Sequence, residues 1–247
     1  MIKKSRFVVS IGLCLALTGS AMAFATGATD NKPFVDGQIS PTKLDKKKFK
    51  PISLFSGVRT EFPGGTPSGT QSNSASEYLS YSKNIKFDFD AGAVCTTLPP
   101  AGSTTDQARS ACPADSYLGS GVAEVQGPGI APITDIVVSV FRGPAKNGIQ
   151  LHTYSPTLGQ AAPTVLGSVV KSKVSGFGQA LNVPNAPVTG ALAITKFNAT
   201  ISKASKAVLG VCKQKTMTFQ RDTVWNDGST STSTTTQNCK QKKSKKH

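Results

Sequence analysis

The sequence predicts an all-β protein: an antiparallel β-sandwich or a partly closed barrel, with one short helix and disordered basic ends. Segments rich in β-branched and aromatic residues recur along the chain, and glycine, proline and Asn-Gly turns separate them at short intervals. Four cysteines remain once an N-terminal export signal is set aside, and they suit a fold braced by disulfides.

The first 23 residues have the layout of a secretory signal peptide. A basic start and an apolar run over residues 7–17 precede the small-residue motif Ala21-Met22-Ala23. The run is shorter than the roughly 20 residues that a spanning helix needs, so we expect cleavage after Ala23, or after Ala25 as the alternative. The protein is therefore expected to be secreted or extracytoplasmic, with a place at the cell surface as one option.

The formal net charge of +15 is concentrated at the two ends of the chain. Residues 24–50 are expected to form a flexible basic leader, and residues 240–247 a disordered lysine-rich tail. Solvated ends without a role are one interpretation. The other is attachment to anionic envelope polymers or lipid headgroups, which would use Lys240, Lys242, Lys243, Lys245 and Lys246. The part between is nearly balanced in charge, so no specific nucleic-acid partner is expected.

A single β domain is expected over residues 51–239, with ordered structure beginning near residue 51. Ile85, Phe87 and Phe89 alternate with polar residues, and this period of two is typical of a strand with one wet face. Further strands are predicted over residues 121–125, 133–141, 149–154, 165–174, 180–183 and 191–201.

The last element is predicted to be a hairpin. Residues 216–225 would pair with residues 229–238 across the turn Asn226-Asp227-Gly228. The second of these strands is a run of serine and threonine, which suits a polar edge strand. Trp225, the single tryptophan, would lie at the tip of the hairpin, where it either contacts a ligand or caps the core.

The cysteines are expected to form two disulfides. Three pairings of Cys95, Cys112, Cys212 and Cys239 are possible, and we favour Cys95–Cys112 and Cys212–Cys239 because each pair brackets one local unit. The first pair would close over a short helix near residues 104–111, capped by Ser103. No metal site is expected, since C-x-x-C spacing is missing from the sequence.

Catalytic motifs are scarce. The sequence contains no G-x-S-x-G pentapeptide and no phosphate-binding loop, and no cofactor is expected. His152 is the one histidine of the predicted domain, so imidazole chemistry would have to use it. A lone strand histidine is more often a packed or surface residue, and we expect no enzymatic activity; His152 remains a candidate ligand contact.

The motifs Cys112-Pro113, Leu118-Gly119-Ser120-Gly121 and Leu151-His152-Thr153, with Cys95 before them and Cys212, Phe219 and Cys239 after, resemble a group of exported, β-rich bacterial proteins with four cysteines and no assigned activity. The resemblance covers most of the region from Val58 to Cys239. It implies export, disulfides and a β fold, and it carries over no functional residue.

Taken together, the sequence predicts a non-enzymatic binding or structural protein of the envelope or the exterior. Two other functions stay open. One is an extracellular carrier with a pocket for a lipid or small apolar ligand, which a deep and dry cavity would favour. The other is an exported hydrolase that uses carboxylates or His152.

Overall fold

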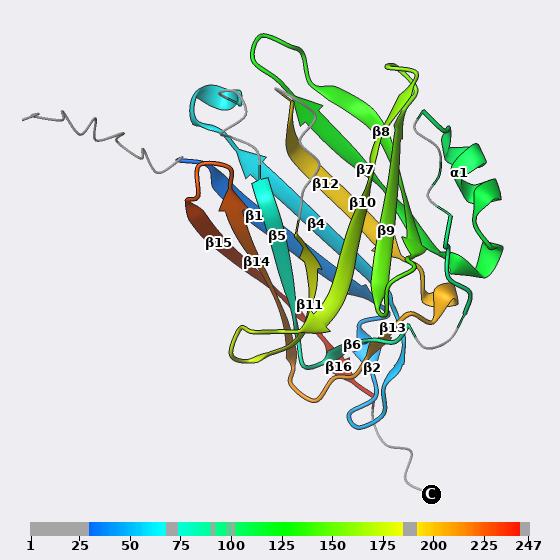
Figure 1. Ribbon diagram of the computed structural model, residues 1–247. Coiled ribbons are helices and arrows are strands. Elements are labelled where there is room, and N and C mark those ends of the chain that lie inside the picture. The colour runs from blue at the N-terminus through cyan, green and yellow to red at the C-terminus, as the bar shows by residue number, and fades with distance from the viewer. Residues whose placement is uncertain are drawn as a thin grey trace, which may run out of the picture.

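The computed structural model describes residues 30–67, 74–89, 92–97, 99, 102–184 and 192–242. The predicted signal peptide and Lys243, Lys245 and Lys246 lie outside these residues. The described chain is mostly β-strand, and one α-helix lies on the outside of a large antiparallel sheet that nearly closes into a barrel (Figure 1). The predicted fold class is confirmed.

The main sheet has eleven strands, and every neighbouring pair in it is antiparallel. In spatial order the strands are β1 (Lys32–Ser40), β4 (Ser53–Glu61), β12 (Ala193–Ile201), β7 (Tyr117–Gln126), β8 (Ile133–Arg142), β9 (Gly148–Ser155), β10 (Gln160–Lys171), β11 (Phe177–Val183), β5 (Ser74–Ser82), β14 (Thr216–Trp225) and β15 (Thr230–Asn238).

The remaining elements are short. They are β2 (Lys43–Leu44), β3 (Lys50–Pro51), β6 (Ile85–Phe87), β13 (Val208–Gly210), β16 (Lys240–Gln241), the helix α1 (Thr105–Ala111) and single 3-10 turns at Pro63–Gly65, Ala114–Ser116 and Lys203–Ser205. The predicted final hairpin is confirmed as β14 and β15, paired from Thr216 opposite Asn238 to Val224 opposite Thr230.

The two edge strands of the sheet, β1 and β15, approach each other and complete the barrel wall. The Gln237 side chain bridges them, because its Oε1 accepts from the Ile39 N–H at 2.6 Å and its Nε2 donates to the Ile39 carbonyl at 3.5 Å. Gly37 of β1 faces the barrel interior, where a Cβ atom would lie 2.2 Å from the Phe219 ring. The missing side chain therefore leaves the space that this ring occupies.

Short strands lie across one end of the barrel, at the bottom of Figure 1. Buried aromatic side chains fill this closed end. Tyr81 packs edge-on against Phe87 and Phe219, with ring centroids 4.9 and 6.1 Å apart. Burial raises the pKa of Tyr81 to about 12, and its hydroxyl lies 3.2 Å from Ser56 Oγ. Below these rings, the three-stranded sheet β3-β13-β6 crosses the end of the barrel, and the Cys212–Cys239 disulfide fixes the chain beside it.

The helix α1 covers the outer face of β8 and β9. The predicted Cys95–Cys112 disulfide joins its C-terminal end to the segment 92–97, where the Cys95 N–H donates to the Arg142 carbonyl of β8 at 2.9 Å. The sequence predicted Ser103 as the capping residue of this helix. The structure has Thr104 in that role. Thr104 Oγ1 accepts from the Gln107 N–H at 3.2 Å, and Gln107 Oε1 accepts from the Thr104 N–H at 2.9 Å. The cap thus stands one position later than predicted, and Gln107 completes a capping box with it.

The prediction of a flexible leader up to Lys50 is wrong for the described part of that segment. Residues 32–40 form β1 and pair with β4 over their whole length. Val35 and Ile39 are buried on the inner face, and Gly37 stands between them. The apolar alternation was hidden because the middle inward position carries no side chain.

The prediction of a disordered tail from Lys240 is likewise wrong at its start. Lys240 and Gln241 form β16, which runs parallel to β2. The N–H groups of Lys240 and Lys242 donate to the carbonyls of Thr42 and Leu44 at 2.9 and 2.7 Å. Because these bonds come from the backbone, the lysine side chains stay exposed and their charge gave no hint of a strand.

Candidate ligand-binding cavity

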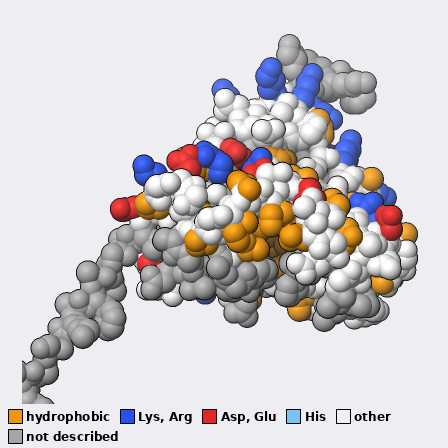
Figure 2. Space-filling model, turned by 90° about the horizontal axis from the view of Figure 1, so that it is seen from above, with side chains coloured by type: hydrophobic (Ala, Val, Ile, Leu, Met, Phe, Trp, Pro, Cys, Tyr) orange, Lys and Arg blue, Asp and Glu red, His pale blue; other side chains and the backbone are white. Residues whose placement is uncertain are grey.

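The end of the barrel opposite the closed one contains a cavity of about 430 Å³. Its walls come from β4, β5, β14 and every strand from β7 to β12. Figure 2 looks onto this end of the molecule, where hydrophobic side chains gather around a hollow. The volume falls in the range of about 300–1,000 Å³ that is usual for small-molecule sites.

Most of the inward-pointing side chains at this end are medium-sized aliphatic residues, whereas the rings of Tyr81, Phe87 and Phe219 fill the other end. Leu79, Leu151 and Val165 reach into the cavity and are nine-tenths buried. Five partly buried apolar side chains that pack against the core also line the cavity: Val58, Leu181, Leu192, Ile194 and Phe197. The lining is thus mostly aliphatic.

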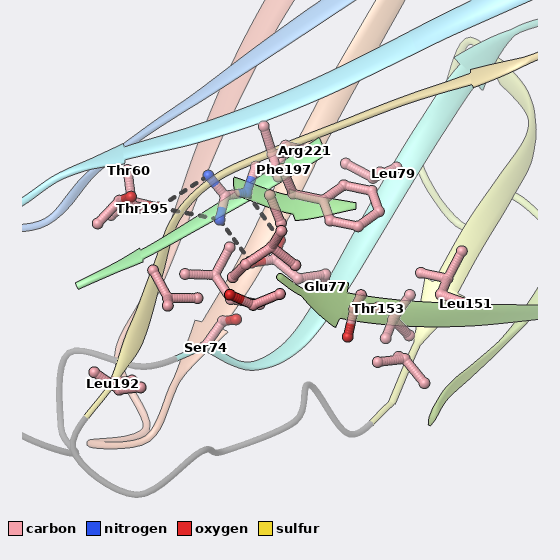
Figure 3. A pocket seen from close by; sticks show the side chains of 18 of the residues that line it. Thr60, Ser74, Glu77, Leu79, Leu151, Thr153, Leu192, Thr195, Phe197 and Arg221 are labelled. Atoms are coloured by element: carbon pink, nitrogen blue, oxygen red, sulfur yellow. Dashed lines mark hydrogen bonds and ion pairs between the residues drawn. The ribbon is translucent and has the colours of Figure 1, made fainter. Parts of the chain in front are cut away.

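A buried ion pair forms the charged part of the cavity wall (Figure 3). Arg221 of β14 donates from Nε and Nη2 to the two carboxylate oxygens of Glu77 of β5, at 2.8 and 2.6 Å. The Arg221 side chain is 3% exposed and that of Glu77 14%. This bidentate geometry is the strongest that an arginine and a carboxylate form.

The remaining donors of Arg221 are also used. Nη1 donates to the Arg59 carbonyl at 2.9 Å and lies 3.5 Å from the Phe34 carbonyl, and both Nη atoms lie 3.3 Å from Thr60 Oγ1. Arg221 therefore ties β14 to β1 and β4, across the join between the two edges of the sheet. A guanidinium has five N–H donors, and these contacts account for all of them.

Glu77 is less completely bonded than its partner. Its Oε2 accepts from Arg221 Nε and from Thr223 Oγ1, the latter at 3.0 Å, whereas Oε1 accepts from Arg221 Nη2. A carboxylate offers about four lone-pair sites, so three bonds leave one of them for a further donor. Glu77 lines the cavity, so the unused lone-pair site of its carboxylate is available to a hydrogen-bond donor of a ligand.

Thr153 of β9 adds a second polar point to the wall. Its side chain lines the cavity and the residue is 9% exposed, yet Oγ1 has no hydrogen-bond partner among the described residues. An unsatisfied buried hydroxyl costs about 1–3 kcal/mol. Such a group in the wall of a mostly apolar cavity indicates a place for a polar atom of a ligand or for a water molecule.

Trp225 lies in the cavity wall and not at an exposed hairpin tip. It is 2% exposed, and its Nε1 donates to Ser231 Oγ at 2.8 Å. The Arg221 guanidinium lies 6.0 Å from the centre of its ring. Of the two alternatives left open for this residue, burial is therefore correct, and the single tryptophan is also next to the cavity.

His152 is not part of the cavity. Its neighbours Leu151 and Thr153 point inward, so His152 points outward, under α1, where its Nε2 donates to the Ser103 carbonyl at 3.0 Å. Burial lowers the pKa of His152, and the hydrogen bond to that carbonyl opposes the shift. No described side chain orients His152 as a catalytic dyad would require: Asp135, a carboxylate on the neighbouring strand β8, accepts from Ser155 Oγ and the Thr157 N–H.

The sequence analysis missed both Glu77 and Arg221. A signal for Arg221 was present, since it shares the parity of Phe219 and Trp225 in a period-two strand and so had to point inward with them. No comparable sequence pattern pointed to Glu77, because its partner Arg221 lies 144 residues away in sequence.

No family model matches the chain, and no curated protein matches its sequence. In the described residues, we find no group of three side chains that could ligate a metal. No described helix has both the length and the apolar character needed to cross a bilayer.

Proposed function

We propose that this protein is an extracytoplasmic carrier that holds a small, largely apolar molecule inside its barrel. The observation that supports this function is the aliphatic cavity at the open end, with one ion pair and one unpartnered hydroxyl in its wall. Apolar walls with a few fixed polar groups are the usual composition of small-molecule sites. Of the alternatives that the sequence left open, the carrier accounts for the cavity best.

The size of the cavity limits the ligand. A volume of about 430 Å³ lies near the lower end of the range of about 300–1,000 Å³ for small-molecule sites. A chain of ten to twelve carbons or a molecule with two or three rings fits this limit. The two disulfides suit an oxidising compartment, which supports export.

Binding of the neutral fluorophore N-phenyl-1-naphthylamine tests the proposal. We expect saturable binding of one probe per chain, with energy transfer from Trp225 because this tryptophan lines the cavity. Ala123→Phe places a ring in the cavity and is expected to weaken binding at least about tenfold. Val122→Phe is the matched control, since the neighbouring Val122 side chain is exposed on the outer face. Equal affinity in the two variants, or no saturable binding, contradicts the proposal.

A second role has support at the opposite end of the molecule. We define the basic pole as the exposed lysines of the closed end: Lys43, Lys46, Lys47, Lys48, Lys50, Lys213, Lys215, Lys240 and Lys242. Backbone bonds join the segments that carry them, from Lys240 to Thr42, from Cys212 to Asp45 and from Cys239 to Lys215. The basic leader and tail, about 190 residues apart, thus form one surface.

The basic pole would hold the carrier to an anionic surface. Each lysine near such a surface contributes about 1 kcal/mol, and salt screens the attraction. We expect binding to phosphatidylglycerol vesicles that 0.5 M NaCl abolishes, and weaker binding after deletion of residues 240–247 or after the combined change of Lys46, Lys47 and Lys48 to Glu. Binding to soluble polyphosphate but not to vesicles would assign the pole to envelope polymers. Vesicle binding unaffected by both changes contradicts the role.

A further inference from the structure

We infer that the cavity selects neutral ligands that carry a hydrogen-bond donor, such as an alcohol or phenol, and excludes anionic ligands such as fatty acids. The inference rests on the proposed carrier function and assigns the chemistry of its ligand. Its basis is the unequal bonding of the Glu77–Arg221 pair, the one pair of charged side chains in the described lining.

An arginine in an apolar pocket suggests a site for a carboxylate, and the contacts here argue against that reading. Every N–H of Arg221 already has an acceptor in the protein, and the side chain is 3% exposed. A ligand carboxylate would have to displace Glu77 or lie beside it without a cation of its own. Two anions next to each other in an apolar site repel strongly.

Glu77 presents the opposite chemistry. It is the more accessible member of the pair, and one lone-pair site of Oε1 is unused by the described residues. Arg221 and Thr223 fix the orientation of the carboxylate, so it is ready to accept a bond without reorganisation. A ligand hydroxyl that donates to it forms a charge-assisted hydrogen bond, which is stronger than a bond between neutral groups.

Geometry fixes the orientation of the ligand. Glu77 and Arg221 lie on one side of the cavity, and aliphatic side chains that include Leu79 and Leu151 line the space beside them (Figure 3). The donor end of the ligand is therefore expected at Glu77 and its apolar body along the aliphatic wall.

Three ligands with the same ten-carbon chain test the inference on the unmodified mature protein: decan-1-ol, 1-methoxydecane and decanoate, each in competition with the neutral naphthylamine probe at pH 7.5. We expect decan-1-ol to bind at least about tenfold more tightly than the ether, which lacks the donor. Decanoate is expected to give no saturable competition. Decanoate binding as tightly as the alcohol overturns the inference and leaves the carrier function standing, whereas failure of probe and ligands alike overturns the carrier function.

The variant Thr153→Val tests whether the hydrogen-bond donor of the ligand bonds to Glu77 or to the Thr153 hydroxyl. The substitution removes the unpartnered hydroxyl at nearly unchanged shape, so the variant is expected to fold. If the ligand donor goes to Glu77, the preference for decan-1-ol over the ether persists in Thr153→Val. Loss of that preference in this variant would assign the donor to Thr153 and contradict the role of Glu77.

Discussion

Arg221→Met is expected to destabilise the folded protein by about 3–5 kcal/mol, because it leaves the Glu77 carboxylate in the barrel without its partner. The change also removes the donors to Thr60 Oγ1 and to the Arg59 carbonyl, which lie on the far side of the sheet join. Urea unfolding of the oxidised protein, followed by circular dichroism, measures the loss.

An exposed ion pair on the same barrel is the control. Arg59 and Glu61 pair on the surface, where each side chain is about half exposed. Arg59→Met is expected to cost less than about 1 kcal/mol, as exposed pairs do. The double variant Arg221→Met with Glu77→Met should be more stable than Arg221→Met alone, since it removes the unpaired charge. Equal costs for the two arginine variants would contradict the structural role given to Arg221.

Removal of the Cys212–Cys239 disulfide is the second large effect that we expect. The bridge joins residues 27 apart in sequence, and loop closure of that length corresponds to about 3.5 kcal/mol in the chain-entropy account. The variant Cys212→Ala with Cys239→Ala should therefore unfold at lower denaturant and temperature. Because the bridge fixes the closed end, amides of β14 and β15 are expected to lose protection from hydrogen exchange.

The other disulfide provides a matched comparison. Cys95–Cys112 joins residues 17 apart, which corresponds to roughly 3.1 kcal/mol, but it holds α1 against the outside of the barrel. The variant Cys95→Ala with Cys112→Ala should therefore lose exchange protection first in α1 and around His152, while β14 keeps its own. The same pattern of lost protection in both variants would contradict the separate roles of the two bridges.

Much of the fold followed from local patterns in the sequence. The hairpin of β14 and β15 was predictable because a turn sequence joins two strands with period two, and the disulfides because each bridges a local unit. β1 was missed because Gly37 interrupts its alternation of apolar residues. Position 37 lacks a side chain because the Phe219 ring, from a strand far along the chain, occupies that space. The residues around Gly37 in the sequence do not predict such a long-range contact.

The candidate site was less predictable than the fold for a similar reason. The cavity is the space that side chains from nine strands leave unfilled. No single segment of the sequence therefore predicts it. Thr153 shows the difficulty: in sequence it is an ordinary strand threonine, and only the assembled barrel makes its hydroxyl a buried group without a described partner. Trp225 was recognised as a candidate contact, although its burial followed from tertiary packing.

Occupancy of the barrel cavity by an apolar chain is tested most directly by methyl NMR during titration with decan-1-ol. We predict saturable shifts and intermolecular NOEs at the cavity methyl groups of Leu79, Leu151 and Ile194. The exposed methyl groups of Val122 and Leu166, on the outer face of the same sheet, should stay unchanged. Shifts confined to those outer residues, or no shift in any methyl group, would contradict the account.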